Sequence, residues 1–218
     1  MRQFKFAGLA AFSLVLAAAG STHVAAGAAR VKEKNGEISY IAPNGERFLV
    51  VEKGGSDPVL SQDGHRVALV CVDPARGGSA LWLYDVPKRS LRKLLRSRPT
   101  DNNKTNLREL NHPAFSPDGR FLYIQSAAWV TEGTLFKVDL RTGAHRFVSP
   151  TNLLLIMRDG PYIGDLIVSE HTYRREGGTY EQLWLKRPDG TVVTTVPGTT
   201  SNSEDPRAWL KAHHWQAW

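Results

Sequence analysis

A repeated segment built around Asp-Gly constrains the fold of this chain more than any other feature. Residues 57–72 read DPVLSQDGHRVALVCV and residues 112–127 read HPAFSPDGRFLYIQSA. Both copies have a polar residue, Pro, a small or apolar residue, an apolar residue, Ser, any residue, Asp-Gly, a basic residue and an apolar run. Gly accepts positive φ and Asp bonds its own backbone, so Asp-Gly predicts the tight turn of a β-hairpin. Each copy is expected to form a short strand, a turn and a mostly buried strand.

A second hairpin follows each copy. Residues 79–95 (SALWLYDVPKRSLRKLL) and 133–148 (GTLFKVDLRTGAHRFV) both contain a Leu, an aromatic residue, an Asp, a polar turn and a further strand. Each full repeat therefore has four short strands. The two Asp-Gly turns lie farther apart than the ~40–45 residues common for such repeats. The excess falls in the polar stretch 97–111, which contains DNNKTN and is expected to form a long loop.

Weaker copies flank these two repeats. Arg158-Asp159-Gly160 sits where a third turn is expected, followed by a strand at 165–173 and a hairpin at 180–196 that turns at Pro188-Asp189-Gly190. Before the first full copy, residues 37–52 form another hairpin with Asn44-Gly45 at its turn. The pattern predicts about three and a half repeats.

The units PVLSQDGHRVALV and PAFSPDGRFLYIQ resemble the TolB-like β-propeller repeat, a relative of the WD40-like repeats. The copy at 116–120 matches that pattern fully, whereas the copy at 61–66 has Gln62 in place of Pro and the third copy lacks Ser-Pro. The resemblance implies an all-β fold: a β-propeller of four-stranded blades over 36–198, small or incomplete, with about three to four blades where known propellers have four to eight. The chain shows no counterpart of the α/β domain that precedes the propeller in TolB, so no close match to TolB is expected.

Two arrangements of so few blades remain open. One is a small ring of four blades with an irregular last blade, and the other is an open arc. An open arc exposes a sheet edge that needs covering, either by the Trp-rich tail at 199–218 or by self-association. Within the tail, Asp205–Trp218 is expected to form a short helix with Asp205 as its N-cap and Pro206 as its first residue.

The first 29 residues have the layout of a secretory signal peptide. Arg2 and Lys5 precede an uncharged apolar run, and small residues follow it. The apolar run, 6–19, is shorter than the ~20 residues of a spanning helix, which argues against a membrane anchor. Cleavage is expected after Ala19, Ala26 or Ala29. The resemblance adds a bacterial periplasmic setting, with an extracellular one as the alternative.

The net charge and the cysteine content limit the classes of binding partner that are expected. The chain has a formal net charge of +7 and a single cysteine, and loss of the leader leaves about +5. The densest basic run, Lys88–Arg98, is either a patch for an anionic polymer or membrane surface, or the solvated face of an edge strand, which its interleaved leucines favour. Nucleic-acid binding is not expected, because export argues against it and no recognition motif occurs. Cys71 is expected to be a small core residue.

Neither a metal site nor a cofactor site is predicted. Turn formation accounts for Asp63, Asp118 and Asp189, and the residues after Asp118-Gly119 offer no calcium ligands. The seven histidines show no metal-binding spacing, although Glu170-His171 and His213-His214 are clustered. No Gly-x-Ser-x-Gly elbow occurs, which excludes a serine peptidase. Trp82, Phe136 and Trp184 occupy matched strand positions and are expected to pack in the core rather than stack on bases.

The absence of a catalytic set leads to a non-enzymatic, periplasmic propeller scaffold as the expected function, with a protein or a cell-envelope component as its partner. The alternative is a propeller enzyme acting on an anionic polysaccharide in the manner of a lyase. Such an enzyme needs basic and metal-binding residues that converge at the channel. Its candidate residues are His112, Arg158, His171 and Arg174.

Overall fold

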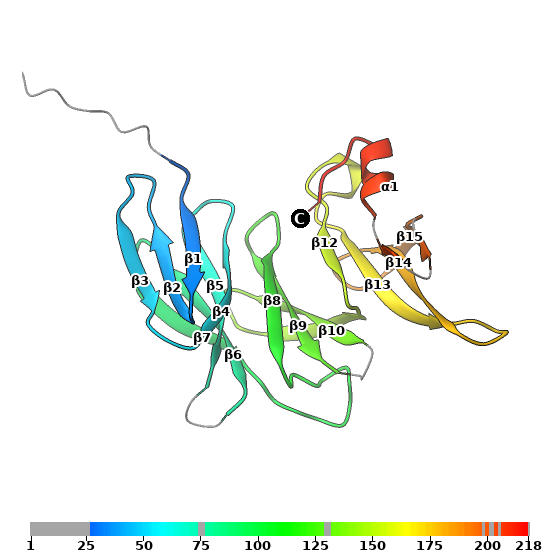
Figure 1. Cartoon of the computed structure of the whole chain (residues 1–218), viewed down its shortest axis with the longest axis horizontal. Helices are drawn as coiled ribbons and strands as arrows, with labels where there is room; N and C mark the ends of the chain where they lie inside the picture. The colour runs from blue at the N-terminus through cyan, green and yellow to red at the C-terminus, as the bar shows by residue number, and fades with distance from the viewer. Residues whose placement is uncertain are drawn as a thin grey trace, which may run out of the picture.

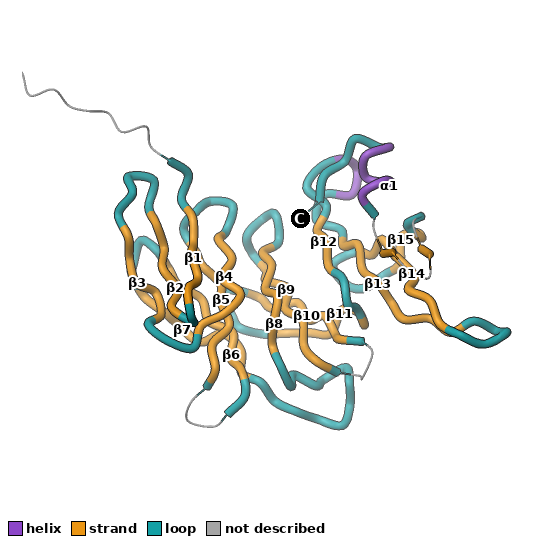
Figure 2. Tube along the Cα trace, in the orientation of Figure 1, coloured by secondary structure: helices purple, strands orange, loops and turns teal. Residues whose placement is uncertain are grey.

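The computed structural model describes residues 27–73, 77–128, 132–197, 199–200, 203–204 and 206–217. The predicted leader lies almost wholly outside them. The described chain is dominated by antiparallel strands, which confirms the all-β prediction. Four sheets follow one another along the chain (Figures 1 and 2) and are called sheets I to IV below. Sheet I consists of β1 (Arg30–Lys34), β2 (Glu37–Ile41) and β3 (Arg47–Val51).

Sheets II and III are the two predicted full repeats. Each is a four-stranded meander in which every strand pairs with its neighbours in sequence. Sheet II contains β4 (Gly55–Leu60), β5 (Arg66–Val72), β6 (Ser79–Asp85) and β7 (Ser90–Arg96). Sheet III contains β8 (Leu110–Phe115), β9 (Phe121–Ala127), β10 (Gly133–Asp139) and β11 (His145–Pro150). The predicted long loop joins the two sheets over 97–109, and it is pinched by a bridge between Arg98 and Leu107.

Sheet IV is the weak third repeat. It contains β12 (Leu154–Ile156), β13 (Leu166–Tyr173), β14 (Thr179–Lys186) and β15 (Val192–Thr195). Asp159-Gly160 does not form the expected tight turn, because the connection from β12 to β13 runs over 157–165 and includes the 3-10 helix η1 (Gly160–Tyr162). A two-stranded ribbon, β16 (Thr199–Thr200) and β17 (Ser203–Glu204), follows.

The core lies between the sheets because successive side chains of a strand point to opposite faces. In β5, Val67 and Leu69 pack toward sheet I, whereas Ala68 and Val70 pack toward sheet III. A strand covered on both faces reads as a continuous apolar run. Cys71 belongs to the same buried strand, and burial raises the pKa of its thiol. Its predicted role as a core residue is confirmed.

The sheets form an open arc. Figure 1 shows them fanned from β1–β3 at one end to β12–β15 at the other, with β4, β8 and β12 on the inner side. Within the described residues, no strand of sheet I pairs with a strand of sheet IV. The predicted count of three to four blades is confirmed, and the ring alternative is wrong.

The C-terminal helix exists but is shorter than predicted. Helix α1 spans Arg207–Ala212, with Pro206 in the N-cap position; Asp205, the predicted N-cap, lies outside the described residues. The chain leaves the helix at His213 because the residues beyond it bond to the β12–β13 connection. The N–H of Arg158 donates to the carbonyl of Gln216 at 2.8 Å. These tertiary bonds replace the helical ones that the sequence predicted.

The tail covers the outer face of sheet IV. Leu210, Trp209 and Trp215 pack on an apolar cluster formed by Met157, Ile167, Leu183, Leu185 and Val196. In a closed ring this face would meet another blade. Trp215 sits so close to Gly160 that a Cβ there would lie 2.6 Å from the indole Nε1. The tail, one of the two covers predicted for an open arc, is therefore present.

Candidate binding surface

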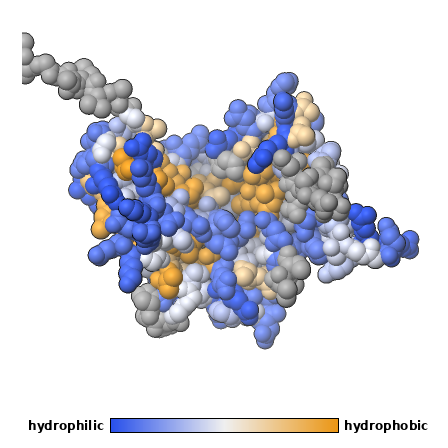
Figure 3. Space-filling view, viewed as in Figure 1, coloured by the Kyte–Doolittle hydropathy of each residue, from blue (hydrophilic) through white to orange (hydrophobic). Residues whose placement is uncertain are grey.

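The inner strands line a hollow on the concave side of the arc. Its volume is about 440 Å³, and it is bounded by residues of β4, β8 and the start of β12, together with Gln125. The walls are apolar at Pro58, Val59, Pro113 and Leu154, and polar groups stand between them. In the view of Figure 3, hydrophobic residues gather in the centre of the molecule, where the inner strands of Figure 1 lie. Such mixed, concave surfaces are typical binding sites.

Two matched backbone distortions mark this hollow. Asp57 and His112 occupy equivalent positions in the two repeats, each directly before a proline, and their φ angles are 49° and 48°. Both lie at bulges, where the register of β4 on β5 and of β8 on β9 shifts. A non-glycine residue at positive φ costs about 1–3 kcal/mol and is concentrated at functional sites. The same distortion in two repeats is therefore a pointer to function.

The two distorted residues contact each other across the sheets. The N–H of His112 donates to Asp57 Oδ2 at 3.3 Å, and the His112 Nδ1 lies 3.1 Å from Asn111 Oδ1. Within the described part of the chain, Asp57 Oδ1 and His112 Nε2 make no hydrogen bond. Both are free to meet a ligand. The sequence contains a signal for this pair, because a polar residue precedes Pro in both copies. Of the two residues, only His112 is among the candidate site residues predicted from the sequence.

A second hollow extends the concave face toward the tail. It measures about 480 Å³ and is lined by inner residues of β4 and β8, by Arg158 and Asp159, and by Gln216 of the tail. Asp159 Oδ1 accepts the N–H of Gln216 at 2.7 Å. The tail thus forms part of the wall of the concave face.

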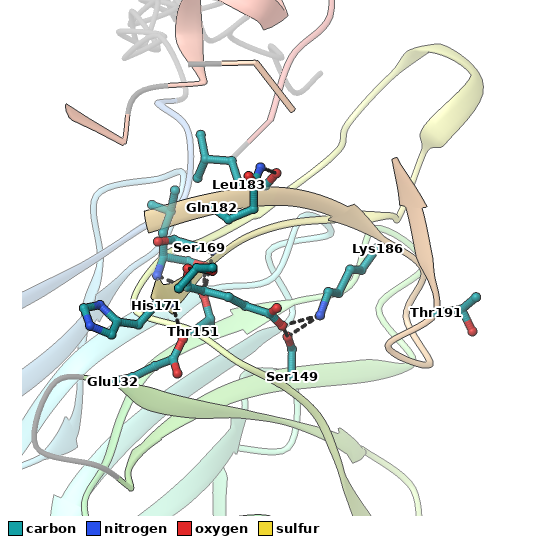
Figure 4. A network of polar contacts seen from close by, with 12 residues as sticks. Glu132, Ser149, Thr151, Ser169, His171, Gln182, Leu183, Lys186 and Thr191 are labelled. Atoms are coloured by element: carbon teal, nitrogen blue, oxygen red, sulfur yellow. Dashed lines mark hydrogen bonds and ion pairs between the residues drawn. The ribbon is translucent and has the colours of Figure 1, made fainter. Parts of the chain in front are cut away.

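A largely buried ion pair within sheet IV is hydrogen-bonded to a serine of sheet III (Figure 4). Lys186 Nζ contacts Glu170 Oε1, and it also donates to Ser149 Oγ at 2.9 Å. Ser149 Oγ in turn donates to Glu170 Oε1 at 2.7 Å. The Lys186 side chain is only 8% exposed. Every member of this cluster has a partner, so its chemistry is used within the fold.

His171 belongs to a neighbouring polar cluster. Its Nδ1 lies 2.9 Å from Glu181 Oε1, and Ser169 Oγ donates to Glu181 Oε2 at 2.8 Å. Its backbone N–H donates to Glu132 Oε1 at 2.8 Å. Burial raises the pKa of Glu132, an effect that the same N–H partly offsets. These bonds tie β13 to β14 and to the segment before β10.

The four residues that the lyase alternative requires do not share a hollow. His112 lines the first hollow on the concave face and Arg158 the second. His171 is held by Glu181, and the guanidinium of Arg174 lies over the Tyr180 ring at 5.4 Å. Neither of the two concave hollows is lined by more than one of these four residues.

The Asp-Gly residues hold turns, as predicted. Asp63 Oδ1 accepts the Ser61 hydroxyl at 2.5 Å and the His65 N–H at 3.0 Å, while Gly64 has a φ of 72°. The Ser61 hydroxyl is the main reason that the pKa of Asp63 falls to about 2. Asp118 and Ser116 repeat this geometry at 2.6 Å. Although burial acts to raise its pKa, hydrogen bonds from Ser116 and Arg120 keep it below the ordinary value.

Replacing Ser61 with Ala is expected to raise the pKa of Asp63 from about 2 toward 3.8. The ionised Asp63 is favoured in the folded state, so its contribution to stability is present above the ordinary pKa and is lost as the pH falls toward 2. A side-chain carboxyl NMR titration measures this shift. Asp189, whose pKa is lowered chiefly by the Thr191 N–H, serves as the internal control and should not move. An unchanged Asp63 titration contradicts the assignment.

The basic run on β7 is mostly occupied within the fold. Lys88 pairs with Asp85, and the Arg89 guanidinium lies 4.4 Å from the centre of the Phe48 ring. Other contacts pair Arg92 with the Leu140 carbonyl, and Lys93 and Arg96 with Asp73. β7 is the edge strand of sheet II. The structure therefore agrees with the edge-strand interpretation of this run.

The remaining predicted features are placed as follows. Trp82, Phe136 and Trp184 pack in three different inter-sheet clusters, as expected for core residues. His213 stacks on Trp215 with ring centroids 4.5 Å apart. No group of three or more His, Cys, Asp or Glu side chains among the described residues is arranged to hold a metal ion. No helix in the described residues has the length and apolar character needed to cross a membrane.

Comparison with known proteins supports the fold. No protein-family model and no curated sequence matches the chain. Among solved structures, the tricorn protease aligns with a TM-score of 0.53 and 15% identity, over 80% of this chain and 16% of the protease. The β-propeller domain of the Trilobed protease from Pyrococcus furiosus, described as having an open velcro topology, aligns with a TM-score of 0.52 and 14% identity, over 76% of this chain and 51% of that one.

TolB from Acinetobacter baumannii aligns with a TM-score of 0.30 and 14% identity, over 72% of this chain and 50% of TolB. The chain thus spans about half of the length of the Trilobed protease domain and of TolB, and about a sixth of the tricorn protease. Identities this low show the fold alone. The chain is a small, incomplete β-propeller of mostly four-stranded blades with a short C-terminal helix.

Proposed function

We propose that this chain is a non-enzymatic propeller scaffold that binds a protein or a cell-envelope component on its concave face. The observation that carries the proposal is the matched pair of strained residues, Asp57 and His112, at the 440 Å³ hollow. Two repeats share the same costly backbone conformation at this concave surface. A carboxylate oxygen and an imidazole nitrogen stand there between apolar walls, the combination that fixes a ligand's orientation.

The packed strands that carry this surface favour ligand binding over catalysis there. The hollow is built on strands whose other faces are packed between sheets, so binding there costs little ordering of the backbone. The histidine and carboxylates of sheet IV are already bonded to one another, as at His171 and Glu181. They hold the blades together and leave the concave face as the surface for a partner.

The setting we propose is the periplasm, with the extracellular space as the alternative. The support is the basic-apolar-small layout of 1–29. Ala29 packs against the core between sheets I and II, and β1 begins at Arg30. Cleavage after Ala19 or Ala26 leaves both intact, so we favour those two positions over cleavage after Ala29.

Capture from envelope extracts tests the proposed surface. The wild-type chain should retain a partner that the double variant Asp57→Asn/His112→Ala retains at least about tenfold less, because two oriented polar contacts are lost. The control is Asp101→Asn/His65→Ala, which removes the same chemical groups from exposed positions that line neither hollow. Quantitative mass spectrometry compares the three baits.

Two outcomes contradict this proposal. Equal recovery of every partner by the wild type and the Asp57/His112 variant removes the concave face as the binding surface. Turnover of a uronate polymer by the purified chain, lost on changing His112, Arg158 or His171 to Ala, establishes the polysaccharide-lyase alternative instead. Release of unsaturated uronate products provides the measurement.

A further inference from the structure

A third hollow lies away from the concave face. Its volume is about 1050 Å³, and it is bounded by the end of β7, the 97–109 loop, Gly77-Gly78 and His145. The loop is the part of the chain that exceeds an ordinary repeat. Loops of this length without secondary structure of their own are uncommon inside a compact domain, and an ordered one is a candidate for a functional role. The proposed scaffold role does not use it.

Cations dominate the lining of this hollow. Arg96, Arg98 and Arg108 lie on it with His145, and Glu109 is the one carboxylate among the lining residues. Arg96 Nε is paired with Asp73 at 3.1 Å. Arg98 and Arg108 are exposed, and within the described part of the chain neither side chain has a hydrogen bond or ion pair. They differ in this from the basic residues of β7, which have partners inside the fold.

The loop geometry brings these two arginines to one cavity. The N–H of Arg98 donates to the Leu107 carbonyl at 2.7 Å, and the N–H of Leu107 donates back at 3.1 Å. The bridge therefore holds Leu107, the residue before Arg108, directly opposite Arg98. Leu95 and Leu107 are buried and supply an apolar floor, and the Thr100 and Thr105 hydroxyls lie on the same lining.

We propose that this hollow, called the loop cavity, binds a ligand that carries a carboxylate or phosphate group on an apolar body. Guanidinium groups bind both oxyanions by two parallel hydrogen bonds. The apolar floor accommodates the rest of the ligand. The overall positive charge of the chain increases the local concentration of such anions. This site is separate from the concave face and does not depend on the function proposed there.

Three small probes test the loop cavity on the full chain: phenyl phosphate, benzoate and the neutral benzyl alcohol. Calorimetric titration should show one site that binds the two anions at least about tenfold more tightly than the alcohol. The two anions separate phosphate recognition from carboxylate recognition. Raising the salt concentration should weaken binding of the anions, since the arginines are exposed.

Variants assign the binding to the two arginines. Arg98→Ala and Arg108→Ala should each weaken phenyl phosphate binding by about tenfold, and Arg→Lys at either position should restore part of the affinity because charge returns without the fork. The control Arg30→Ala/Arg175→Ala removes two positive charges from exposed positions outside the cavity and should bind as the wild type does. Three results overturn the proposal. The first is equal affinity of the chain for the alcohol and the anions, the second is unaltered affinity for phenyl phosphate in Arg98→Ala/Arg108→Ala, and the third is no binding of any probe.

Discussion

Ending the chain at Pro197 is expected to turn a monomer into a species that associates with itself. The truncation removes the tail from the outer face of sheet IV and exposes the apolar residues Ile167, Leu183 and Leu185, each fully buried in the intact chain. A contiguous apolar sheet face of this kind binds other apolar surfaces. Light scattering at several concentrations measures the change, and we expect the intact chain to remain monomeric because the tail covers the apolar outer face of sheet IV.

A point variant tests whether the docking of the tail on sheet IV, and not merely its presence in the chain, prevents association. Leu210→Asp places a charge at a side chain that is 8% exposed against sheet IV, so the tail should detach and the variant should associate as the truncated chain does. Lys211→Asp changes an exposed residue of the same helix and serves as the control. A truncated chain that stays monomeric and unfolds at the wild-type temperature shows that the tail is not the cover.

The two ends of the arc avoid exposing a large apolar sheet face in different ways. Sheet I exposes Arg30, Lys32 and Arg47 together with one large apolar residue, Leu49, which is 56% exposed, so its outer face is mostly polar in the way of a capping repeat. The outer face of sheet IV is apolar, and it requires the tail. Stacked repeats bury their apolar faces only against neighbours. The arc can therefore end at sheet I without a further element, whereas at sheet IV it cannot.

The repeats were predictable because their signals are local. Asp63-Gly64 and Asp118-Gly119 set their own turns, and strand alternation needs only the neighbouring residues. The same locality explains the errors. Asp159-Gly160 resembles a turn in sequence, but the bonds that the tail makes with the β12–β13 connection give that segment another shape. The helix prediction for 205–218 failed beyond Ala212 for the same reason.

Features that depend on distant partners had little or no sequence signal. Ser149 and Lys186 are 37 residues apart, and Glu132 and His171 are 39 apart, yet each pair is hydrogen-bonded. Nothing in the local pattern of a strand shows which buried polar residue will face it from the next sheet. Asp57 is intermediate: its alignment with His112 was visible in the repeat, but its positive φ was not.

Glu170→Ala is expected to lower the free energy of unfolding by about 3 kcal/mol, the range found when one partner of a buried ion pair is removed. The loss is large because Lys186, 8% exposed, keeps its charge with only the Ser149 hydroxyl as a partner. Urea unfolding followed by tryptophan fluorescence measures it, since Trp184 packs in the same inter-sheet cluster. Glu176→Ala, at an exposed site between β13 and β14, should cost little.

The double variant Glu170→Leu/Lys186→Met distinguishes the charge pair from simple packing. If the cost of Glu170→Ala comes from an uncompensated charge, removing both charges should recover most of the lost stability, because apolar side chains of similar volume replace buried ion pairs at little cost. If the double variant is as unstable as Glu170→Ala, the pair acts through shape instead. Since the pair joins β13 to β14 and the Ser149 hydroxyl bonds it to β11, we expect amide exchange in Glu170→Ala to accelerate first in sheet IV and its tail.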